Sequence, residues 1–369
     1  MEEFIVSALK YRPNTFDTVV GQESITSTLK NAITTNHLAH SYLFCGSRGV
    51  GKTSCARIFA KTINCLNLSE NHEPCNECES CKSFNESRSF NIHELDAASN
   101  NSVEDIRLLC EKVRIPPQIG KYSVYIIDEV HMLSGAAFNA FLKTLEEPPA
   151  HAIFILATTE KQKIIPTILS RCQIYDFNRM SVFNTIEHLK NIATKEGIVV
   201  EEEGLNVIAQ KSDGAMRDAL SIFDQLVSSY GKKLDYDSVI KGLNVLDYDY
   251  YFRLVDAFIE SRVADILVIF NDILSRGFNE LMFINGLGKH LRDVLVCKDV
   301  ASIQLLELSG QVKEKYMQQA EKCSQDFLYD ALNVVDICET QFRSSSEKRL
   351  CVEIALIRLA QIEEAKKKS

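Results

Sequence analysis

The sequence contains little that would mark a membrane, secreted or DNA-coating protein. No apolar run among its 369 residues reaches the length that a bilayer span needs. The first residues, MEEFIVSALKYRPNTF, begin with acidic side chains and have no signal-peptide core, so we expect a cytoplasmic location. The net charge of −9 argues against indiscriminate coating of DNA, so any nucleic-acid contact should come from a local basic surface.

Tryptophan is absent and proline is scarce, whereas 46% of the residues are hydrophobic and 25% are charged, as in ordinary globular proteins. There is no internal repeat, and the basic tip KKKS is the only low-complexity segment. Twelve cysteines in a large chain without an export signal favour free thiols and a metal site over disulfides. The length allows two or three domains.

Short β-like runs alternate with helical stretches through residues 1–178, which predicts an α/β domain with a parallel sheet. The β-like runs are SYLFCG (41–46), FNIHELDA (90–97), YSVYIID (122–128) and AIFILATT (152–159). The last two are continuously apolar, as expected for strands buried on both faces. From about Arg179 we expect the strands to stop, because helical spacing predicts a small helical domain over 179–242 and a second over 243–369.

A phosphate-binding loop is predicted directly after the first β-like run. The sequence GSRGVGKT fits G-x-x-x-x-G-K-[ST], in which glycines let backbone N–H groups form an anion cradle. Lys52 would reach the β- and γ-phosphates of ATP, and Thr53 would offer its hydroxyl to Mg²⁺. A strand before the loop and a helix after it argue against the alternative, a simple glycine-rich turn. The predicted nucleotide-binding residues here are Gly46, Ser47, Arg48, Gly49, Val50, Gly51, Lys52, Thr53 and Ser54.

Two carboxylates follow the apolar run in VYIIDEVHML. At the carboxyl edge of a parallel sheet, Asp128 can hold Mg²⁺ through water and Glu129 can polarise an attacking water. Together with the loop, this pair predicts ATP hydrolysis; without the loop, it would be interpreted as a solvated acidic pair. In the next run, LATTE, Thr158 or Thr159 can orient the lytic water, or can simply be a β-branched residue that ends a strand.

Four cysteines form a separate candidate site. Cys65, Cys75, Cys78 and Cys81 have the spacing C-x9-C-x2-C-x2-C, which lets thiolates converge on one tetrahedral ion. A full set of four sulfur ligands predicts structural Zn²⁺. An iron–sulfur cluster is the competing interpretation, but nothing in the sequence suggests electron transfer.

These motifs together resemble the AAA+ clamp-loader ATPases. The matching blocks cover residues 11–225 in order: YRPNTFDTVVGQE, HSYLFCGSRGVGKTS, the four-cysteine insert (about 65–81), LDAAS, YIIDEVHMLS, FNAFLKTLEEPP, LATTEKQKIIPTILSRC and DGAMRDALSIFDQ. Beyond about residue 243 the resemblance rests on helical character and length. It implies an AAA+ P-loop domain over 1–178, a helical lid over 179–242 and a helical collar over 243–369, through which subunits assemble into a five-membered ring.

The resemblance also implies an activity and a set of partners. The activity is ATP-driven opening of a sliding clamp and its loading on primer-template DNA during bacterial replication. The partners are the delta and delta-prime clamp-loader subunits, further copies of this chain, the sliding clamp and primer-template DNA, with no membrane involved. The chain ends at Ser369, about where the collar should finish, so we do not expect the helicase- and polymerase-binding domains of longer family members.

Further site residues are implied by the resemblance alone. Arg217, in the sequence GAMRDA, would be the second sensor, a cation from the lid that touches the γ-phosphate. The residues implied to lie against the adenine, or to complete its pocket, are Tyr11, Arg12, Pro13, Val20 and Gly21.

Arg171, in the sequence ILSRC, would be too far away to serve its own ATP and would instead reach the γ-phosphate of a neighbouring subunit. The alternative is an ion pair within the subunit or a charge at a helix C-terminus.

One departure from the family concerns DNA. The loop after LDAAS often carries basic residues in the family, but here it contains Asn100, Asn101 and Ser102, so contacts with DNA should be weaker or involve Arg107.

Four other functions fit the sequence less well. A non-hydrolysing stator subunit conflicts with the intact phosphate loop and acidic pair. A DExH helicase would need a second α/β lobe, whereas this chain is predicted to be helical after residue 178. A branch-migration motor would not explain the four cysteines or SRC. A nucleotide-binding interaction module would be distinguished by steady-state ATPase activity measured with and without primed DNA and a sliding clamp.

Overall fold

The computed structural model divides into two compact units. Unit 1 comprises Met1–Ile192 and Ala209–Asp224, and unit 2 comprises Ala193–Ile208 and Gln225–Ser369. The structure describes residues 5–86, 88–117, 119–299, 301–303, 306 and 310–368. Among them, no helix combines the length and the apolar character needed to cross a membrane.

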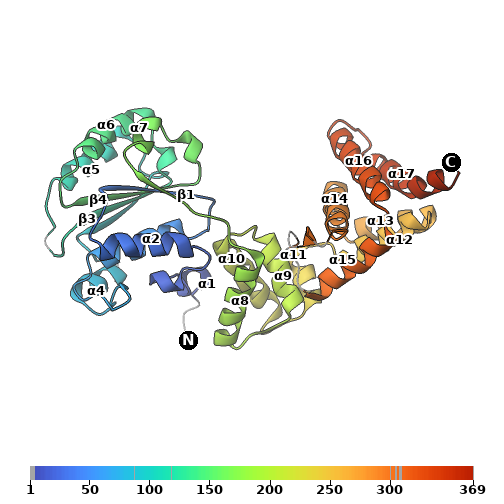
Figure 1. Ribbon diagram of the computed structural model, residues 1–369, viewed down its shortest axis with the longest axis horizontal. Helices are drawn as coiled ribbons and strands as arrows, with labels where there is room; N and C mark the ends of the chain where they lie inside the picture. The colour runs from blue at the N-terminus through green and yellow to red at the C-terminus, as the bar shows by residue number, and fades with distance from the viewer. Residues whose placement is uncertain are drawn as a thin grey trace. The chain divides into compact units, whose positions relative to one another are not determined.

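A five-stranded parallel sheet forms the centre of unit 1, with strand order β2-β3-β4-β1-β5 (Figure 1). Every residue of β1 and β4 is buried, which explains their continuous apolar sequences. The α/β fold class expected from the sequence is confirmed. The strands are β1 (Ser41–Cys45), β2 (Ile92–Asp96), β3 (Ser123–Asp128), β4 (Ala152–Thr158) and β5 (Gln173–Asp176).

Helices cover both faces of this sheet (Figure 1). On one face lie α2 (Glu23–Thr34), α3 (Lys52–Ile63) and α4 (Glu79–Asn85), and on the other lie α5 (Val103–Val113), α6 (Gly135–Glu146) and α7 (Pro166–Leu169). Phe44 and Phe59 belong to the core of the first face, whereas Phe141 and Phe154 belong to that of the second. The short elements of unit 1 are α1 (Ser7–Lys10), η1 (Phe16–Thr18), η2 (Val130–Met132) and η3 (Lys161–Lys163).

The order of the strands determines which loops meet. Because β4 lies between β1 and β3, the loop after β1 and the carboxylates after β3 flank the end of β4 at the same edge of the sheet. The register pairs Cys45 with Thr158, the last residues of β1 and β4.

The structure corrects two expectations about strands. β5 was not predicted, because it is an edge strand in which only Tyr175 is buried and which therefore has no apolar run. Strands also do not stop at Arg179, since β6 (Val199–Val200) pairs in parallel with β7 (Lys233–Leu234). A two-residue ladder is too short to produce a periodic sequence signal.

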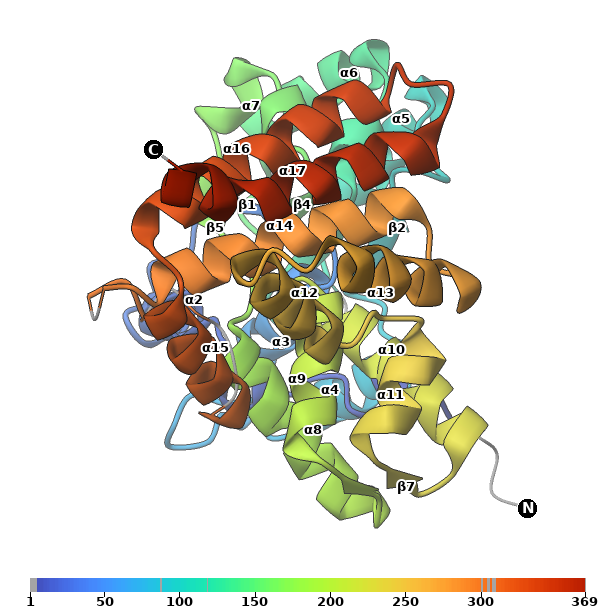
Figure 2. The same ribbon diagram turned by 90° about the vertical axis from the view of Figure 1, so that its right-hand side faces the viewer.

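Unit 2 is built mainly from helices, and those from Tyr248 onward share one apolar core. In this unit α16 packs against both α14 and α17, and the three helices lie side by side in Figure 2. The helices beyond the sheet are α8 (Val182–Glu196), α9 (Glu202–Lys211), α10 (Met216–Tyr230), α11 (Tyr236–Leu243), α12 (Tyr248–Ile259), α13 (Val263–Ser275), α14 (Glu280–Val296), α15 (Gly310–Lys322), α16 (Gln325–Phe342) and α17 (Lys348–Lys368). α8, α9 and α10 contribute residues to both units.

Candidate functional site

The predicted phosphate loop joins the end of β1 to the start of α3. Gly51, directly before α3, has a φ of 103°, a left-handed conformation that favours glycine. Gly46 has a φ of 149°, and a Cβ added there would lie 2.6 Å from the backbone oxygen of Phe177. Glycine is therefore needed at both ends of the loop, as the sequence motif predicts.

Lys52, the first residue of α3, turns back towards the loop. Its Nζ donates hydrogen bonds to the backbone oxygens of Gly46, across 2.8 Å, and of Ser47, across 2.9 Å. Burial lowers the pKa of Lys52, and the nearby carboxylates of Glu129 and Asp128 oppose this shift. The cation is thus held over the loop that would cradle phosphates.

The acidic pair lies beside the loop. The Thr53 hydroxyl donates a hydrogen bond to Asp128 Oδ2 across 2.7 Å, which brings together the two residues predicted to hold Mg²⁺. Asp128 Oδ1 accepts the backbone N–H of Glu129 across 2.9 Å. The Glu129 carboxylate in turn accepts the Thr159 hydroxyl across 2.9 Å. The ends of β1, β3 and β4 therefore place one cation, two carboxylates and two hydroxyls together.

Sequence reasoning missed His131, two residues after Glu129. Its side chain is 6% exposed, and its Nδ1 lies 3.4 Å from Glu129 Oε2 and 3.0 Å from the Thr158 hydroxyl. Its Nε2 lies 3.4 Å from Glu160 Oε1. The imidazole therefore bridges the candidate base and a second glutamate. Its position in the motif DEVH was the available signal.

A cavity of about 510 Å³ opens at this edge of unit 1. The sequence-predicted residues that line it are Tyr11, Arg12, Pro13, Val20, Arg48, Gly49, Gly51, Lys52, Thr53, Ser54, Asp128, Glu129 and Arg217. Those that do not line it are Gly21, Gly46, Ser47, Val50, Thr159 and Arg171. Lining residues without a sequence prediction include Leu9, Met180, His188, Met216, Leu220 and Asp224.

Arg217 lines this cavity from the start of α10, which belongs to unit 1 and lies close to the phosphate loop. A Cβ added to Gly49 of the loop would lie 3.4 Å from the Cβ of Arg217 and 3.1 Å from that of Ala215. The loop glycine thus allows the backbone before α10 to approach the phosphate loop closely.

Arg171 lies apart from the cavity, two residues beyond α7. Its side chain forms an ion pair with Glu146 across 2.6 Å and donates to the backbone oxygen of Thr167 across 2.7 Å. The residue is exposed. The structure thus shows the intrasubunit ion pair that the sequence analysis left open.

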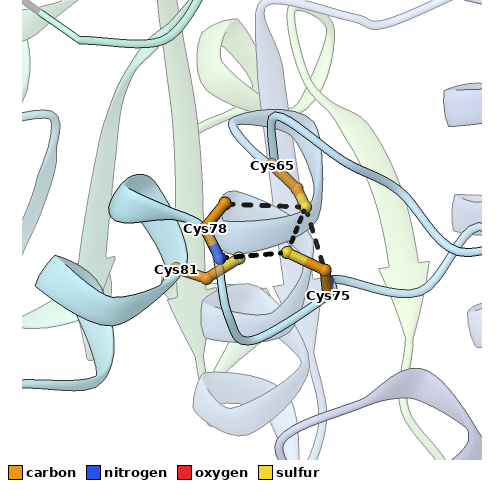
Figure 3. A group of neighbouring side chains, drawn as sticks. All are labelled: Cys65, Cys75, Cys78 and Cys81. Carbon is orange, nitrogen blue, oxygen red and sulfur yellow. Dashed lines mark hydrogen bonds between the residues drawn. The ribbon is translucent and has the colours of Figure 1, made fainter.

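The four cysteines converge next to α4: Cys65, Cys75 and Cys78 lie in the loop between α3 and α4, and Cys81 lies within α4, so residues 65–81 form the four-cysteine loop. Figure 3 shows their side chains turned towards one another, and all four sulfur atoms lie within 4.8 Å of each other. Burial opposes ionisation of Cys78, but hydrogen bonds from the backbone N–H groups of Leu66 and Cys81, together with those from the Cys81 and Cys75 thiols, lower its pKa to about 6. Four sulfur atoms at this separation could hold one tetrahedral metal ion.

Comparisons with known proteins agree with this geometry. The family described as DNA polymerase III, delta subunit, matches residues 21–181, and that of the clamp-loader ATPase lid domain matches 185–232. The family of DNA polymerase III subunits gamma and tau, domain III, matches 236–369. The chain is 32% identical over 357 residues to the DNA polymerase III subunit gamma of Buchnera aphidicola subsp. Baizongia pistaciae. The aligned residues make up 96% of each chain. The chain belongs to the gamma/tau family of DNA polymerase III subunits.

Two tau relatives are longer than this gamma/tau chain. The DNA polymerase III subunit tau of Bacillus subtilis is 40% identical over 351 residues, which are 95% of this chain and 62% of the relative. The tau subunit of Escherichia coli is 40% identical over 308 residues, which are 81% of this chain and 48% of the relative. The chain thus spans about half to three-fifths of these relatives. The resemblance to clamp-loader ATPases is confirmed.

Proposed function

We propose that this chain binds and hydrolyses ATP as a motor subunit of a clamp loader. ATP binding and hydrolysis would be coupled to opening a sliding clamp and loading it on primer-template DNA. The observation that carries the proposal is the meeting of Lys52, the Thr53–Asp128 pair and the Glu129–Thr159 pair at one cavity. Membership of the gamma/tau family supports it.

Each residue has a distinct role in this chemistry. Lys52 exchanges the carbonyl oxygens of Gly46 and Ser47 for the β- and γ-phosphate oxygens. Thr53 and Asp128 would hold Mg²⁺, which would supply positive charge against the phosphates. Glu129 accepts a proton from the attacking water.

Two further residues are assigned from their contacts. Thr159 keeps the Glu129 carboxylate in place through its hydroxyl, rather than by lining the cavity itself. Arg217 lines the cavity and provides a second cation for the γ-phosphate. The base-binding side of the cavity is assigned to Tyr11, Arg12, Pro13 and Val20.

Arg171 is proposed to act on the ATP of a neighbouring copy in a five-membered ring. Its position outside the cavity supports this role, because the side chain cannot serve the nucleotide bound there. An arginine supplied in trans stabilises charge on the transferring phosphoryl group. In the free chain, Glu146 holds this cation until a neighbour presents a phosphate.

The four-cysteine loop is proposed to hold one structural Zn²⁺. The donor set supports zinc because four thiolates leave no position for a substrate. The division into P-loop domain (1–178), lid (179–242) and collar (243–369) remains our interpretation. The family matches over 21–181 and 185–232 support its first boundary, whereas the match to gamma and tau domain III begins at 236, before the second. The partners proposed are delta, delta-prime and further copies of the chain, at work in the bacterial cytoplasm.

The test is steady-state ATP hydrolysis by the chain with delta and delta-prime subunits. The expected result is hydrolysis that rises when sliding clamp and primed DNA are added together. No hydrolysis, or a hydrolysis rate that both additions leave unchanged, would contradict the proposal. The second outcome would favour a nucleotide-binding interaction module.

A further inference from the structure

Glu73 connects the four-cysteine loop to a segment outside it. The residue lies between Cys65 and Cys75 and is 8% exposed. Its Oε2 accepts the backbone N–H of Phe16 across 2.8 Å, and its Oε1 accepts that of Asp17 across 3.1 Å. A buried carboxylate is stable only when its oxygens find such partners, so these bonds fix both the glutamate and the segment that it contacts.

A lysine completes this contact. Lys30 Nζ, from α2, lies 2.7 Å from Glu73 Oε1 and 2.7 Å from Asp17 Oδ1. Although burial opposes the shift, the two carboxylates raise the pKa of Lys30, so the cation stays charged. Glu73 thus joins the four-cysteine loop to two neighbouring elements far upstream in sequence, the turn Phe16–Thr18 and α2.

Residues 16–17, whose backbone N–H groups Glu73 accepts, continue directly into the wall of the nucleotide cavity. Phe16 is 1% exposed and packs in the core beneath α2 and α3. The residues that follow it, Thr18, Val19 and Val20, line the cavity. A shift of the turn Phe16–Thr18 would therefore move this wall.

The loop that carries Glu73 is itself anchored to the phosphate-binding side. Lys61 of α3 is 2% exposed and donates a hydrogen bond to Asn76 Oδ1, within the loop, across 2.6 Å. The same helix begins at Lys52, over the phosphate loop. The four-cysteine loop therefore connects the phosphate-binding helix with residues 16–17, which lead directly into the cavity wall at residues 18–20.

We propose that Glu73 is a positioning residue for nucleotide binding, through which the four-cysteine loop sets the affinity of the cavity for ATP. This inference rests on the proposed function, because it assumes that the cavity binds nucleotide. It gives the loop a role beyond its own stability. Glu73 touches no part of the cavity and acts only through residues 16–20.

The test compares Glu73→Gln with Glu77→Gln in the full chain. The amide at position 73 has a single acceptor oxygen and no charge, so one backbone N–H loses its acceptor and Lys30 keeps only the carboxylate of Asp17. Glu77 is an exposed glutamate of the same loop, so its variant matches the charge change without the contact. The probe is a fluorescent ADP titrated with Mg²⁺ present, which measures affinity without hydrolysis.

We expect Glu73→Gln to weaken ADP binding about tenfold, because the binding-competent wall is populated less, while kcat at saturating ATP stays within about twofold. Glu77→Gln should bind ADP like the unaltered chain. Zinc content should be the same in both variants, which shows that the loop is intact. Equal ADP affinity in the two variants would overturn the inference.

A second variant keeps the test decisive if Glu73→Gln folds poorly. Lys30→Gln removes the ion pair but leaves both backbone hydrogen bonds, so we expect about threefold weaker ADP binding. Unchanged affinity in this variant would also overturn the inference. No ADP binding by the unaltered chain would overturn the proposed function itself, which is a different result.

Discussion

Thr159, directly after β4, holds the carboxylate of Glu129, directly after β3. Its hydroxyl donates to Glu129 Oε2 across 2.9 Å, and its backbone N–H reaches the same oxygen across 3.3 Å. Glu129 has a φ of 48°, a left-handed conformation that costs an L-residue about 1–3 kcal/mol and persists only when its surroundings hold it. Thr159 therefore holds the Glu129 carboxylate in the position from which it would accept a proton in the proposed hydrolysis.

Replacing Thr159 by Val should lower kcat for ATP hydrolysis about tenfold or more, because the carboxylate loses one of its two hydrogen bonds from this residue. Affinity for ATP should change little, since Thr159 does not line the cavity. Thr159→Ser retains a hydroxyl and is the matched control. Equal kcat for the Val and Ser variants would show that the hydroxyl has no role.

Lys52→Ala should abolish ATP binding, because it removes the cation above the phosphate loop. Glu129→Gln should bind ATP but hydrolyse it about 10²–10⁴-fold more slowly, because the amide cannot accept the proton. The control is Glu147→Gln, at an exposed glutamate outside the cavity lining. Normal multiple-turnover hydrolysis by Lys52→Ala and Glu129→Gln would refute the assigned site.

Elemental analysis should find one zinc ion per chain. Cys78→Ser should lose the ion and have a lower melting temperature. The kcat per folded molecule should change little, because the site is structural. Cys110→Ser, outside the cluster, is the control. Iron with visible absorbance, or full zinc content in Cys78→Ser, would contradict this assignment.

Arg171 can be tested by mixing two inactive variants. Rings of Arg171→Ala subunits should hydrolyse ATP about 10³–10⁵-fold more slowly, and Lys52→Ala subunits should not bind it. In a mixture, a Lys52→Ala subunit can supply its Arg171 to an intact neighbouring site, so activity should partly return. Absence of any recovery would place the action of Arg171 within its own subunit. Stability should hardly change, because the lost ion pair with Glu146 is exposed.

His290 of α14 should make stability depend on pH. Its Nδ1 lies 2.9 Å from the Tyr316 hydroxyl and its Nε2 lies 2.8 Å from Gln319 Oε1. Burial lowers the pKa of His290 to about 4, from 6.5. Between these values the unfolded chain binds the proton and the folded chain does not. The contribution of neutral His290 to the free energy of unfolding is therefore fully present above about pH 6.5 and is lost as the pH falls towards 4.

At pH 5 this loss amounts to about 2 kcal/mol relative to pH 7.5. Urea unfolding at the two pH values should show it in the unaltered chain and not in His290→Gln, whose side chain does not titrate. The same pH dependence in both proteins would assign the effect to other groups.

Much of the fold could be predicted because its signals are local. The apolar runs that become β3 and β4 are continuous, and the glycines of GSRGVGKT fix the loop between a strand and a helix. Cysteine spacing likewise predicted the cluster that the structure brings together. In each case neighbouring residues alone determine the outcome.

Contacts between distant residues could not be predicted. Glu146 lies far upstream of Arg171, and nothing near Glu73 in sequence indicates a bond to Phe16. His188, on α8, reaches the cavity only through the packing of that helix. Such residues appear in sequence as ordinary surface charges or helix positions, because their partners are set by tertiary structure.

The position of β1 inside the sheet has a consequence for synthesis on the ribosome. Its partners are β4 and β5, both of which are made much later than Ser41–Cys45. At about 5–20 residues per second, the apolar strand waits on the order of ten seconds before any partner strand exists. Nascent chains halted before Ala152 should therefore expose this segment to chaperones, and those that have released Asp176 should not.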